Sequence, residues 1–241
     1  MSRERTANEQ AHAAAVREMF AGIATKYDFL NHFLSVNIDK RWRRLVRRKL
    51  AREIGDPQAL ILDVACGTGD LSVELQQNGA AKVIGTDFCR PMLAIAADKN
   101  LKNKLSIPYL EGDGMNLAFA DNTFDAVTIA FGLRNFANWQ AGLRELCRIT
   151  KKGGKLVILE FSTPIVPGFR QLFNLYFTRI LPRIGGAVSG SRGAYEYLPD
   201  SVSRFPNQKN LAKMMSEIGF TDVSYQNLTG GIAAIHLGTK E

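Results

Sequence analysis

The sequence predicts a doubly wound α/β fold built on a mainly parallel sheet. Apolar, β-rich runs alternate with helical segments between residues 59 and 161. A glycine turn, Cys66-Gly67-Thr68-Gly69, follows the first of these runs, and acidic or amide side chains follow each of the first four. Ligands of such sheets bind at the carboxyl ends of the strands. This edge of the sheet is therefore the candidate site.

The N-terminal part is predicted to be helical. Residues 1–12 are polar, and we expect them to fray ahead of a short helix over residues 13–24. The next segment, residues 26–35, mixes aromatic and polar side chains and fits no simple surface helix. Three of its polar side chains either point into a pocket or face solvent: Tyr27, Asp28 and Asn31.

A basic amphipathic helix is predicted over residues 40–52. Trp42, Leu45, Val46 and Leu50 recur there at helical spacing among basic residues. Such a helix can lie on an anionic membrane surface or on a nucleic-acid backbone. Alternatively, its apolar stripe packs inward and its charges are solvated. Both arrangements are compatible with transient docking.

The predicted core begins after Gly55-Asp56-Pro57. Its five strands span residues 60–65, 83–87, 107–111, 124–130 and 155–161. Pro91 opens the helix after the second strand, in a first turn that tolerates a missing N–H. Another helix is expected over residues 138–149, and Lys152-Gly153-Gly154 is expected to form a tight turn before the fifth strand.

The chain changes character after the fifth strand. Residues 162–205 contain four prolines and an aromatic-rich helix over residues 169–181, whose apolar surface is too broad for one stripe. This helix is expected to form a lid or channel for an apolar substrate, or to pack on the core. Residues 189–193 are a candidate mobile loop. The last elements are a helix over residues 208–218 and an antiparallel hairpin of strands over 223–228 and 232–239.

Length and composition favour one domain with appendages, since the chain has 241 residues of which 46% are hydrophobic. We divide it into an N-terminal helical cap (1–54), a cofactor-binding α/β core (55–161), a helical lid insert (162–205) and a C-terminal part that completes the core sheet (206–241). A net charge of +8 suggests an anionic partner, either nucleic acid or a membrane surface.

Location and metal content are also suggested by the sequence. No apolar run approaches the ~20 residues needed to span a membrane, and the N-terminus has no signal-peptide pattern. We therefore expect a cytoplasmic protein. The three cysteines and three histidines are scattered without metal-ligand spacing, so no metal site is expected.

The glycine turn is the strongest single indication of a cofactor. Asp87 ends the second strand twenty residues after Gly67, where doubly wound nucleotide-binding folds place a ribose-binding acid. Ser72 stands where a dinucleotide fingerprint requires its third glycine, and Asp63 adds an acid that would repel a pyrophosphate. An acidic pocket suits S-adenosylmethionine (SAM), which is cationic. The alternative is a purely structural turn with Asp70 as a cap.

Longer motifs carry a resemblance to a family. The segment Asp63–Asp70, Asp87, Gly112-Asp113-Gly114 and the closing hairpin resemble the class I SAM-dependent methyltransferases. From about residue 16 to 239 the chain resembles the ubiquinone/menaquinone biosynthesis C-methyltransferases (UbiE/MenG). The more specific motifs are Lys26-Tyr27-Asp28-x-x-Asn31 with Trp42, Phe131–Asn135, Leu159–Ser162, Leu181–Gly185 and Tyr195–Leu198. The resemblance implies a Rossmann-like sheet of seven strands with an antiparallel last strand, N-terminal helices and a helical insert after the fifth strand.

The resemblance also implies a cofactor site. Its SAM contacts fall on Thr68, Asp87, Asp113 and Gly114, and we add the strand and turn residues Asp63, Gly67, Gly69 and Ala130. Some relatives have a serine at Ala130, so a hydroxyl contact is absent here. Many carry Gly-Ile-His where this chain has Asn37-Ile38-Asp39, and often an acid at His32. Because of these departures we assign no role to a histidine in that segment, and the cofactor site is intact.

The implied reaction transfers a methyl group from SAM to a ring carbon of a prenylated demethylquinol. The segments Asn31–Ser35 and Ile38–Trp42 resemble menaquinone-only relatives and favour demethylmenaquinol, and the alternative is 2-polyprenyl-6-methoxy-1,4-benzoquinol, or both. We assign Arg134 to hold the developing phenolate, with Asn135 and Tyr27 positioning the hydroxyls. Asp28 or a bound water takes the proton. The implied partners are the lipophilic substrate, the inner face of the cytoplasmic membrane in transient contact, and a second copy in a homodimer.

Three rival functions fit parts of the sequence. A nucleic-acid methyltransferase would suit the positive charge, but the fourth strand ends in Ala130-Phe131-Gly132 instead of the Asn/Asp-Pro-Pro-aromatic turn of amino-nitrogen methylases. No cysteine follows a proline, as cytosine-C5 enzymes require, so we expect no nucleic-acid substrate. The second rival is a small-molecule O- or N-methyltransferase, and the third is a non-enzymatic SAM-binding protein.

Overall fold

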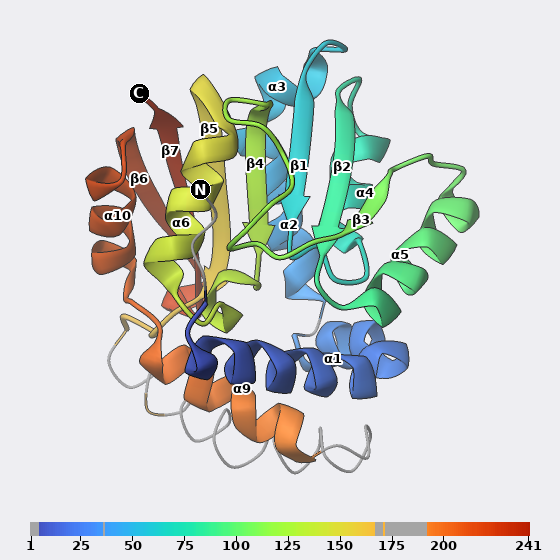
Figure 1. The fold of residues 1–241 in the computed structure, drawn as a ribbon, viewed down its shortest axis with the longest axis vertical. Helices are drawn as coiled ribbons and strands as arrows, with labels where there is room; N and C mark the ends of the chain where they lie inside the picture. The colour runs from blue at the N-terminus through green and yellow to red at the C-terminus, as the bar shows by residue number, and fades with distance from the viewer. Residues whose placement is uncertain (1–4, 36, 167–170, 172–191) are drawn as a thin grey trace.

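The computed structural model describes residues 5–35, 37–166, 171 and 192–241. Its centre is a seven-stranded sheet with helices packed on both faces (Figure 1). The strands are β1 (Leu60–Val64), β2 (Lys82–Asp87), β3 (Tyr109–Glu111), β4 (Phe124–Ala130), β5 (Thr150–Phe161), β6 (Phe220–Leu228) and β7 (Ala233–Lys240). The predicted fold class is confirmed.

The strand order is β3-β2-β1-β4-β5-β7-β6. Strands β1 to β5 pair in parallel, and β7 runs antiparallel to both β5 and β6. The predicted closing hairpin is thus confirmed. The order reverses between β1 and β4, and a doubly wound sheet binds its ligand at such a switch point.

Two apolar layers hold the helices to the sheet. On one face, α2 (Ile38–Lys49), α3 (Ala51–Gly55) and α4 (Asp70–Gln77) bury their apolar side chains against β1, β4 and β5. On the other, α6 (Trp139–Ile149) and α10 (Gln208–Glu217) pack against β4 and β5. Helix α5 (Arg90–Asn103) packs against β2 and β3. The other helices in the described part of the chain are α1 (Ala7–Leu34), α9 (Arg192–Arg204), and the 3-10 helices η1 (Leu133–Asn135) and η3 (Thr229–Gly231).

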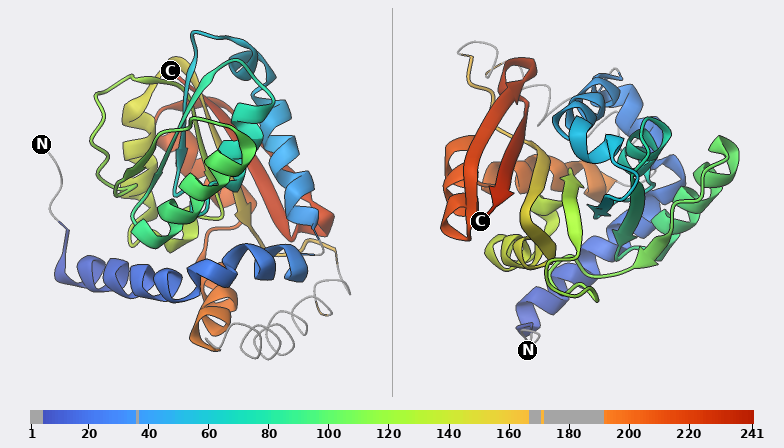
Figure 2. Two further views of the ribbon diagram at one scale, coloured as in Figure 1. Left: turned by 90° about the vertical axis from the view of Figure 1, so that its right-hand side faces the viewer. Right: turned by 90° about the horizontal axis from the view of Figure 1, so that it is seen from above.

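Helix α1 is longer than predicted. It starts at Ala7 and continues through the segment that the sequence left outside a helix. The start is fixed by a capping box, in which Thr6 Oγ1 accepts from Glu9 N (3.3 Å) and Glu9 Oε2 accepts from Thr6 N (3.0 Å). The expectation that residues 1–12 fray is therefore wrong from Thr6 onward. Figures 1 and 2 show α1 lying across the edge where β1 and β2 end.

The basic helix α2 turns its apolar stripe toward the sheet. Trp42, Val46 and Leu50 are buried, and the Trp42 ring packs against the Phe131 and Phe161 rings, at centroid distances of 6.0 and 6.3 Å. The Trp42 indole also donates to Thr229 Oγ1 (3.1 Å). Inward packing of the stripe is therefore the observed arrangement.

The remaining differences between the predicted and the observed elements lie around β5, and part of the predicted insert over residues 162–205 is outside the described residues. Gly153-Gly154 does not form a separate turn, because β5 already begins at Thr150 and the pairing with β4 shifts register there. Between the Phe124–Thr150 and Ala126–Lys155 pairs β5 advances five residues while β4 advances two, and Gly153 lies in this segment at φ 73°. The predicted helix over residues 169–181, Gln171 apart, and Ser189–Ser191 of the predicted loop lie outside the described residues.

Candidate active site

The glycine turn between β1 and α4 has a tightly wound backbone. Ala65, Gly67 and Gly69 all have positive φ, at 50°, 55° and 81°. A Cβ on Gly69 would lie 2.4 Å from the Tyr109 hydroxyl, so only glycine fits beneath that ring. Above Gly67, in contrast, a Cβ would meet nothing within 4 Å. The turn therefore leaves open space at the predicted cofactor position.

Asp87 joins the second strand to this turn. Its carboxylate accepts from Gly67 N and from Cys89 N, both at 2.8 Å. Burial raises the pKa of Asp87 to about 6, although these backbone donors favour the charged form. A carboxylate held by two N–H groups at a strand end is a suitable acceptor for ribose hydroxyls.

Asp63 lies deeper than the sequence suggests. It is 1% exposed, and its carboxylate accepts from Ser72 Oγ (2.6 Å) and Thr128 Oγ1 (3.0 Å). Burial raises the pKa of Asp63 to about 6. Ser72, the residue at the position of the missing third glycine, thus ties the start of α4 to β1. Asp63 acts beneath the turn instead of on its open side.

The third and fourth strand ends carry the remaining predicted cofactor residues. Asp113 follows β3 and pairs with Arg5, which precedes α1. A Cβ on Gly114 would lie 2.2 Å from the Phe136 ring, so a side chain there would displace that ring. Ala130 ends β4 and is half-buried. All of these residues lie at one edge of the sheet.

A network of charged side chains couples α1 to the glycine turn. Thr68 Oγ1 donates to Asp28 Oδ1, and Lys99 on α5 pairs with Asp28 Oδ2 (2.7 Å) and with Asp70. Asp70 Oδ2 also pairs with Arg43 on α2 (2.9 Å). Burial alone would raise the pKa of Asp70, but the two cations lower it below its usual range. Asp70 is the first residue of α4, so the network fixes the start of that helix.

The same network contains a group that could hold a metal ion. Ligand atoms of His32, Asp39 and Asp70 lie within 4.8 Å of one another. However, Arg43 pairs with both carboxylates, and His32 Nδ1 lies 2.7 Å from Asp39 Oδ2. Burial would raise the pKa of Asp39, but Arg43, Ser35 and His32 lower it. The Arg43 guanidinium already pairs with these carboxylates, so ion pairing within the protein explains the cluster without a metal ion.

Arg134 forms a buried ion pair at the end of β4. It is 7% exposed, and its guanidinium donates to Glu160 Oε1 (2.8 Å) and lies 5.3 Å from the centre of the Phe161 ring. Glu160 also accepts from the Arg134 backbone N–H (3.2 Å). The preceding Phe131 has φ 58°, an uncommon value for a bulky residue. The sequence placed Glu160 in the motif Leu159–Ser162 but gave it no role, although an acid within the apolar run of β5 was a visible signal.

The other predicted catalytic residues fall into two groups. Asn135 lies beside Arg134 in η1, where its side-chain Nδ2 donates to Phe131 O (3.3 Å) and its backbone carbonyl faces His12 Nε2 (3.1 Å). Tyr27 instead packs on α1 with Phe20 and near Cys89 and Met92. Among the described residues, therefore, Tyr27 and Asp28 lie on the cofactor side, and Arg134 and Asn135 lie on the β4–β5 side.

These surroundings fit SAM. The open space above Gly67 and the acceptor carboxylates of Asp87 and Asp113 match a ligand rich in hydroxyl and amino donors. Thr68 adds a hydroxyl at the same turn. At Gly69 and at Gly114 an aromatic side chain packs directly against the backbone and leaves no room for a Cβ.

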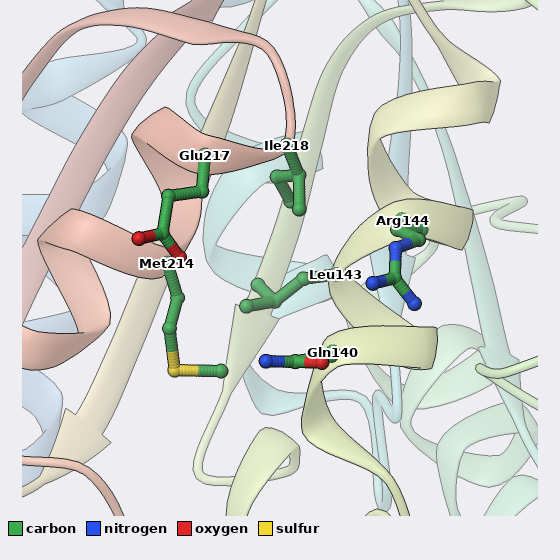
Figure 3. A pocket seen from close by; sticks show the side chains of 6 residues that line it. All are labelled: Gln140, Leu143, Arg144, Met214, Glu217 and Ile218. Atoms are coloured by element: carbon green, nitrogen blue, oxygen red, sulfur yellow. The ribbon is translucent and has the colours of Figure 1, made fainter.

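A separate surface hollow lies between α6 and α10 (Figure 3). Its volume is about 240 Å³, and side chains from both helices face one another across it. Its lining contains Gln140, Leu143, Arg144, Met214, Glu217 and Ile218. None of these residues belongs to the strand-end site, so the hollow is not the candidate active site.

Several solved structures with the same fold are methyltransferases. A SAM-dependent methyltransferase from Thermotoga maritima superposes with a TM-score of 0.65 at 18% identity, covering 93% of this chain and 99% of that one. The [4+2]-cyclase SpnF superposes with a TM-score of 0.63 at 19% identity, covering 83% and 80%. At these identities the likeness concerns the fold alone.

Curated relatives are much closer in sequence. The demethylmenaquinone methyltransferase of Deinococcus radiodurans is 45% identical over 97% of this chain and 95% of its own length. That of Thermus thermophilus is 47% identical over 92% and 100%. The ubiquinone/menaquinone biosynthesis C-methyltransferase UbiE of a Geobacter species is 43% identical over 93% and 96%.

The family model agrees with these relatives. A model of the ubiE/COQ5 methyltransferase family matches residues 5–240. The match includes the glycine turn, the Arg134–Asn135 segment and the closing hairpin, which carried the predicted resemblance. That prediction is confirmed: the chain belongs to the ubiE/COQ5 methyltransferase family.

Proposed function

We propose that this protein methylates a ring carbon of demethylmenaquinol, with SAM as the methyl donor. The observation that carries the proposal is the placement of Arg134 and Asn135 at the same strand edge as the glycine turn and Asp87. Close relatives named demethylmenaquinone methyltransferase support the choice of substrate. Methylation of carbon requires an electron-rich ring, which a quinol acquires when a hydroxyl proton is lost.

The chain's own residues supply binding and electrostatics. Thr68, Asp87, Asp113 and Gly114 would hold the cofactor, with Gly67 and Gly69 shaping the turn. When bound, SAM supplies an activated methyl group on a sulfonium, so the protein needs to align the ring and stabilise a phenolate. Glu160 balances the charge of Arg134. Arg134 therefore acts chiefly as a fixed hydrogen-bond donor toward the substrate oxygen.

The proton of the substrate hydroxyl passes to water in this proposal. Asp28 is a poor acceptor, because its two carboxylate oxygens already accept from Thr68 and pair with Lys99. Its contacts place it with the cofactor turn. Asn135 and Tyr27 position the two hydroxyls of the ring. The segment over residues 169–181, of which the structure describes only Gln171, is proposed to guide the isoprenoid tail.

The prenylated substrate also suggests transient contact with a membrane. No helix in the described part of the chain is long and apolar enough to cross a bilayer. Helices α2 and α3 expose six cations, and four of them share one face of α2 at helical spacing: Lys40, Arg41, Arg44 and Arg48. We propose that this basic face attracts the anionic inner surface of the cytoplasmic membrane.

A substrate panel tests the proposed function. The purified protein is incubated with SAM and, separately, with demethylmenaquinol, 2-polyprenyl-6-methoxy-1,4-benzoquinol or tRNA. We expect methylated product from demethylmenaquinol, detected by mass spectrometry. Preferential turnover of the benzoquinol would shift the assignment to ubiquinone synthesis, as the UbiE-named relatives suggest. Methylation of tRNA alone would reject the proposal.

A further inference from the structure

Several buried polar atoms near Arg134 have no hydrogen-bond partner within the described part of the chain. They are Arg134 Nε, Asn135 Oδ1, Ser162 Oγ and the Tyr197 hydroxyl. Folded proteins pair nearly all of their buried polar atoms, so each exception requires an explanation. Four of the eight such atoms among the described residues belong to this group.

Three elements bring these atoms to one region. Arg134 and Asn135 lie in η1, Ser162 directly follows β5, and Tyr197 lies on α9, which packs against η1. The end of α9 is fixed by Trp139. Its ring packs edge-on against Phe205 at 5.4 Å, and its indole N–H donates to Arg134 O (3.4 Å). The position of Tyr197 relative to Arg134 is thus supported by packing at both elements.

The surroundings of Tyr197 define what it can bind. Arg134 and Glu160 both lie within electrostatic range of its hydroxyl, and burial raises the pKa of Tyr197 above its ordinary value. The side chain is therefore a neutral phenol at physiological pH, able to donate one hydrogen bond and accept others. Asn135 Oδ1 is an acceptor, and Arg134 Nε is a donor. The complementary ligand is an aromatic hydroxyl, which both donates and accepts.

We propose that Tyr197 contacts the substrate ring, donating to the quinol oxygen that Arg134 Nε also binds. The inference rests on the proposed function and adds a residue from α9 to the substrate site. Two donors on one oxygen stabilise the negative charge that it gains when its proton leaves. Helix α9 then contributes directly to recognition of the ring.

Tyr197→Phe is the decisive variant, with Tyr225→Phe as its control. Tyr225 is 45% exposed on the edge strand β6, where it stacks on His236 at 5.5 Å. Removal of an unpaired buried hydroxyl leaves stability equal or higher. We expect Tyr197→Phe to keep the wild-type melting temperature and SAM affinity and to lower kcat/KM for demethylmenaquinol by about 10- to 100-fold. Tyr225→Phe should match wild type in all three.

A binding measurement separates this inference from the proposed function. Calorimetric titration with 1-naphthol, in the presence of S-adenosylhomocysteine, should show at least fivefold weaker binding to Tyr197→Phe than to wild type. That result would support the Tyr197 contact even if wild type failed to methylate demethylmenaquinol. Equal 1-naphthol binding and kcat/KM within twofold of wild type would overturn it.

Discussion

Arg134 cannot be removed without leaving the Glu160 carboxylate unpaired in a dry interior. Loss of one partner of a buried ion pair costs about 3–5 kcal/mol, so Arg134→Ala would lose stability as well as chemistry. Arg134→Lys keeps a positive charge beside Glu160 but lacks the planar fork of donors. We expect about 100-fold lower turnover with little change in melting temperature.

Arg148→Lys is the matched control for that substitution. Arg148 pairs with Glu145 and Asp121, and none of the three belongs to the strand-end site. Its turnover should equal that of wild type. An Arg134→Lys variant that retained turnover within threefold of wild type would contradict the role given to Arg134.

We expect the proposed role of Asp87 to make cofactor binding depend on pH. Because its pKa is raised to about 6, lowering the pH from 7 to 5 protonates it and removes an acceptor. We expect SAM affinity, measured by calorimetry, to fall about tenfold over that range. Asp87→Asn should bind weakly at both pH values. Asp63→Asn should keep the wild-type pH dependence of SAM affinity. If Asp63→Asn lost that pH dependence, the titrating group would be Asp63 instead of Asp87.

At the scale of residues, the sequence predicted which side chains lie at the strand ends but did not predict which side chains pair with one another. Asp87 and Asp113 were predictable, because in a parallel sheet all the carboxyl ends meet at one edge. The Arg134–Glu160 pair joins residues 26 positions apart, and the Asp28–Thr68 bond joins residues 40 apart. Such pairings depend on how elements dock, which local pattern does not specify.

Among the elements, the basic segment was predicted as one helix over residues 40–52, whereas the structure breaks it at Leu50 into α2 and α3. The orientation of its apolar stripe was left open. Burial of Trp42, Val46 and Leu50 decides it, since an apolar stripe packed on the sheet cannot enter a membrane. Helix α1 was predicted too short because the polar composition of residues 1–12 hid the Thr6-x-x-Glu9 capping box. The polar composition thus suggested a frayed segment where the capping box starts a helix, and the capping box determined the helix start.

The membrane attraction that we propose for this basic face would then be electrostatic. We expect binding to vesicles that contain anionic lipid, and its loss in about 0.5 M salt, where the Debye length is only a few ångströms. Arg41→Glu, Arg44→Glu and Arg48→Glu combined should weaken binding at least about 100-fold, at ~1 kcal/mol per cation. The measurement is co-sedimentation with the vesicles.

A charge-matched control distinguishes a specific face from net charge. Lys102→Glu, Lys104→Glu and Lys209→Glu combined change the net charge equally at exposed positions away from α2. This variant should bind vesicles nearly as well as wild type. Equal loss in both triple variants would mean that overall charge alone attracts the lipid.

For the whole molecule, alternation of strands and helices predicted the parallel part of the sheet, and the Thr229-Gly230-Gly231 turn predicted the antiparallel closing hairpin. The full seven-stranded arrangement was implied by the family resemblance. The fold alone does not specify the reaction, because a cyclase shares it with methyltransferases. The function therefore rests on the strand-end side chains and on the relatives that share most of this chain.

Stability of the whole molecule should respond to pH through His236. Burial lowers its pKa to about 4, while its Nε2–H donates to Gln208 O (2.9 Å). The unfolded chain takes up a proton below about pH 6.5, whereas the folded imidazole stays neutral. The contribution of His236 to stability is thus present above pH 6.5 and is lost as the pH falls toward 4.

The comparison variant is His236→Gln, which does not titrate. Asp63 and Asp87 act in the opposite direction, because their raised pKa values favour folding as the pH falls from about 6 toward 4. Wild type and His236→Gln both contain Asp63 and Asp87, so the contributions of these two residues cancel in the difference between the two unfolding free energies. The wild-type advantage in unfolding free energy, measured by urea titration, should shrink by about 2 kcal/mol between pH 7 and pH 5. A constant difference would contradict the burial argument.

The most direct measurement is methyl transfer itself. Wild-type protein is incubated under reducing conditions with demethylmenaquinol and SAM that carries a CD3 group, and the product is fragmented in a mass spectrometer. We predict a menaquinol whose CD3 group is bonded to the ring carbon, with S-adenosylhomocysteine formed in equal amount. A CD3 group on oxygen, or no transfer to demethylmenaquinol, would contradict the proposed reaction.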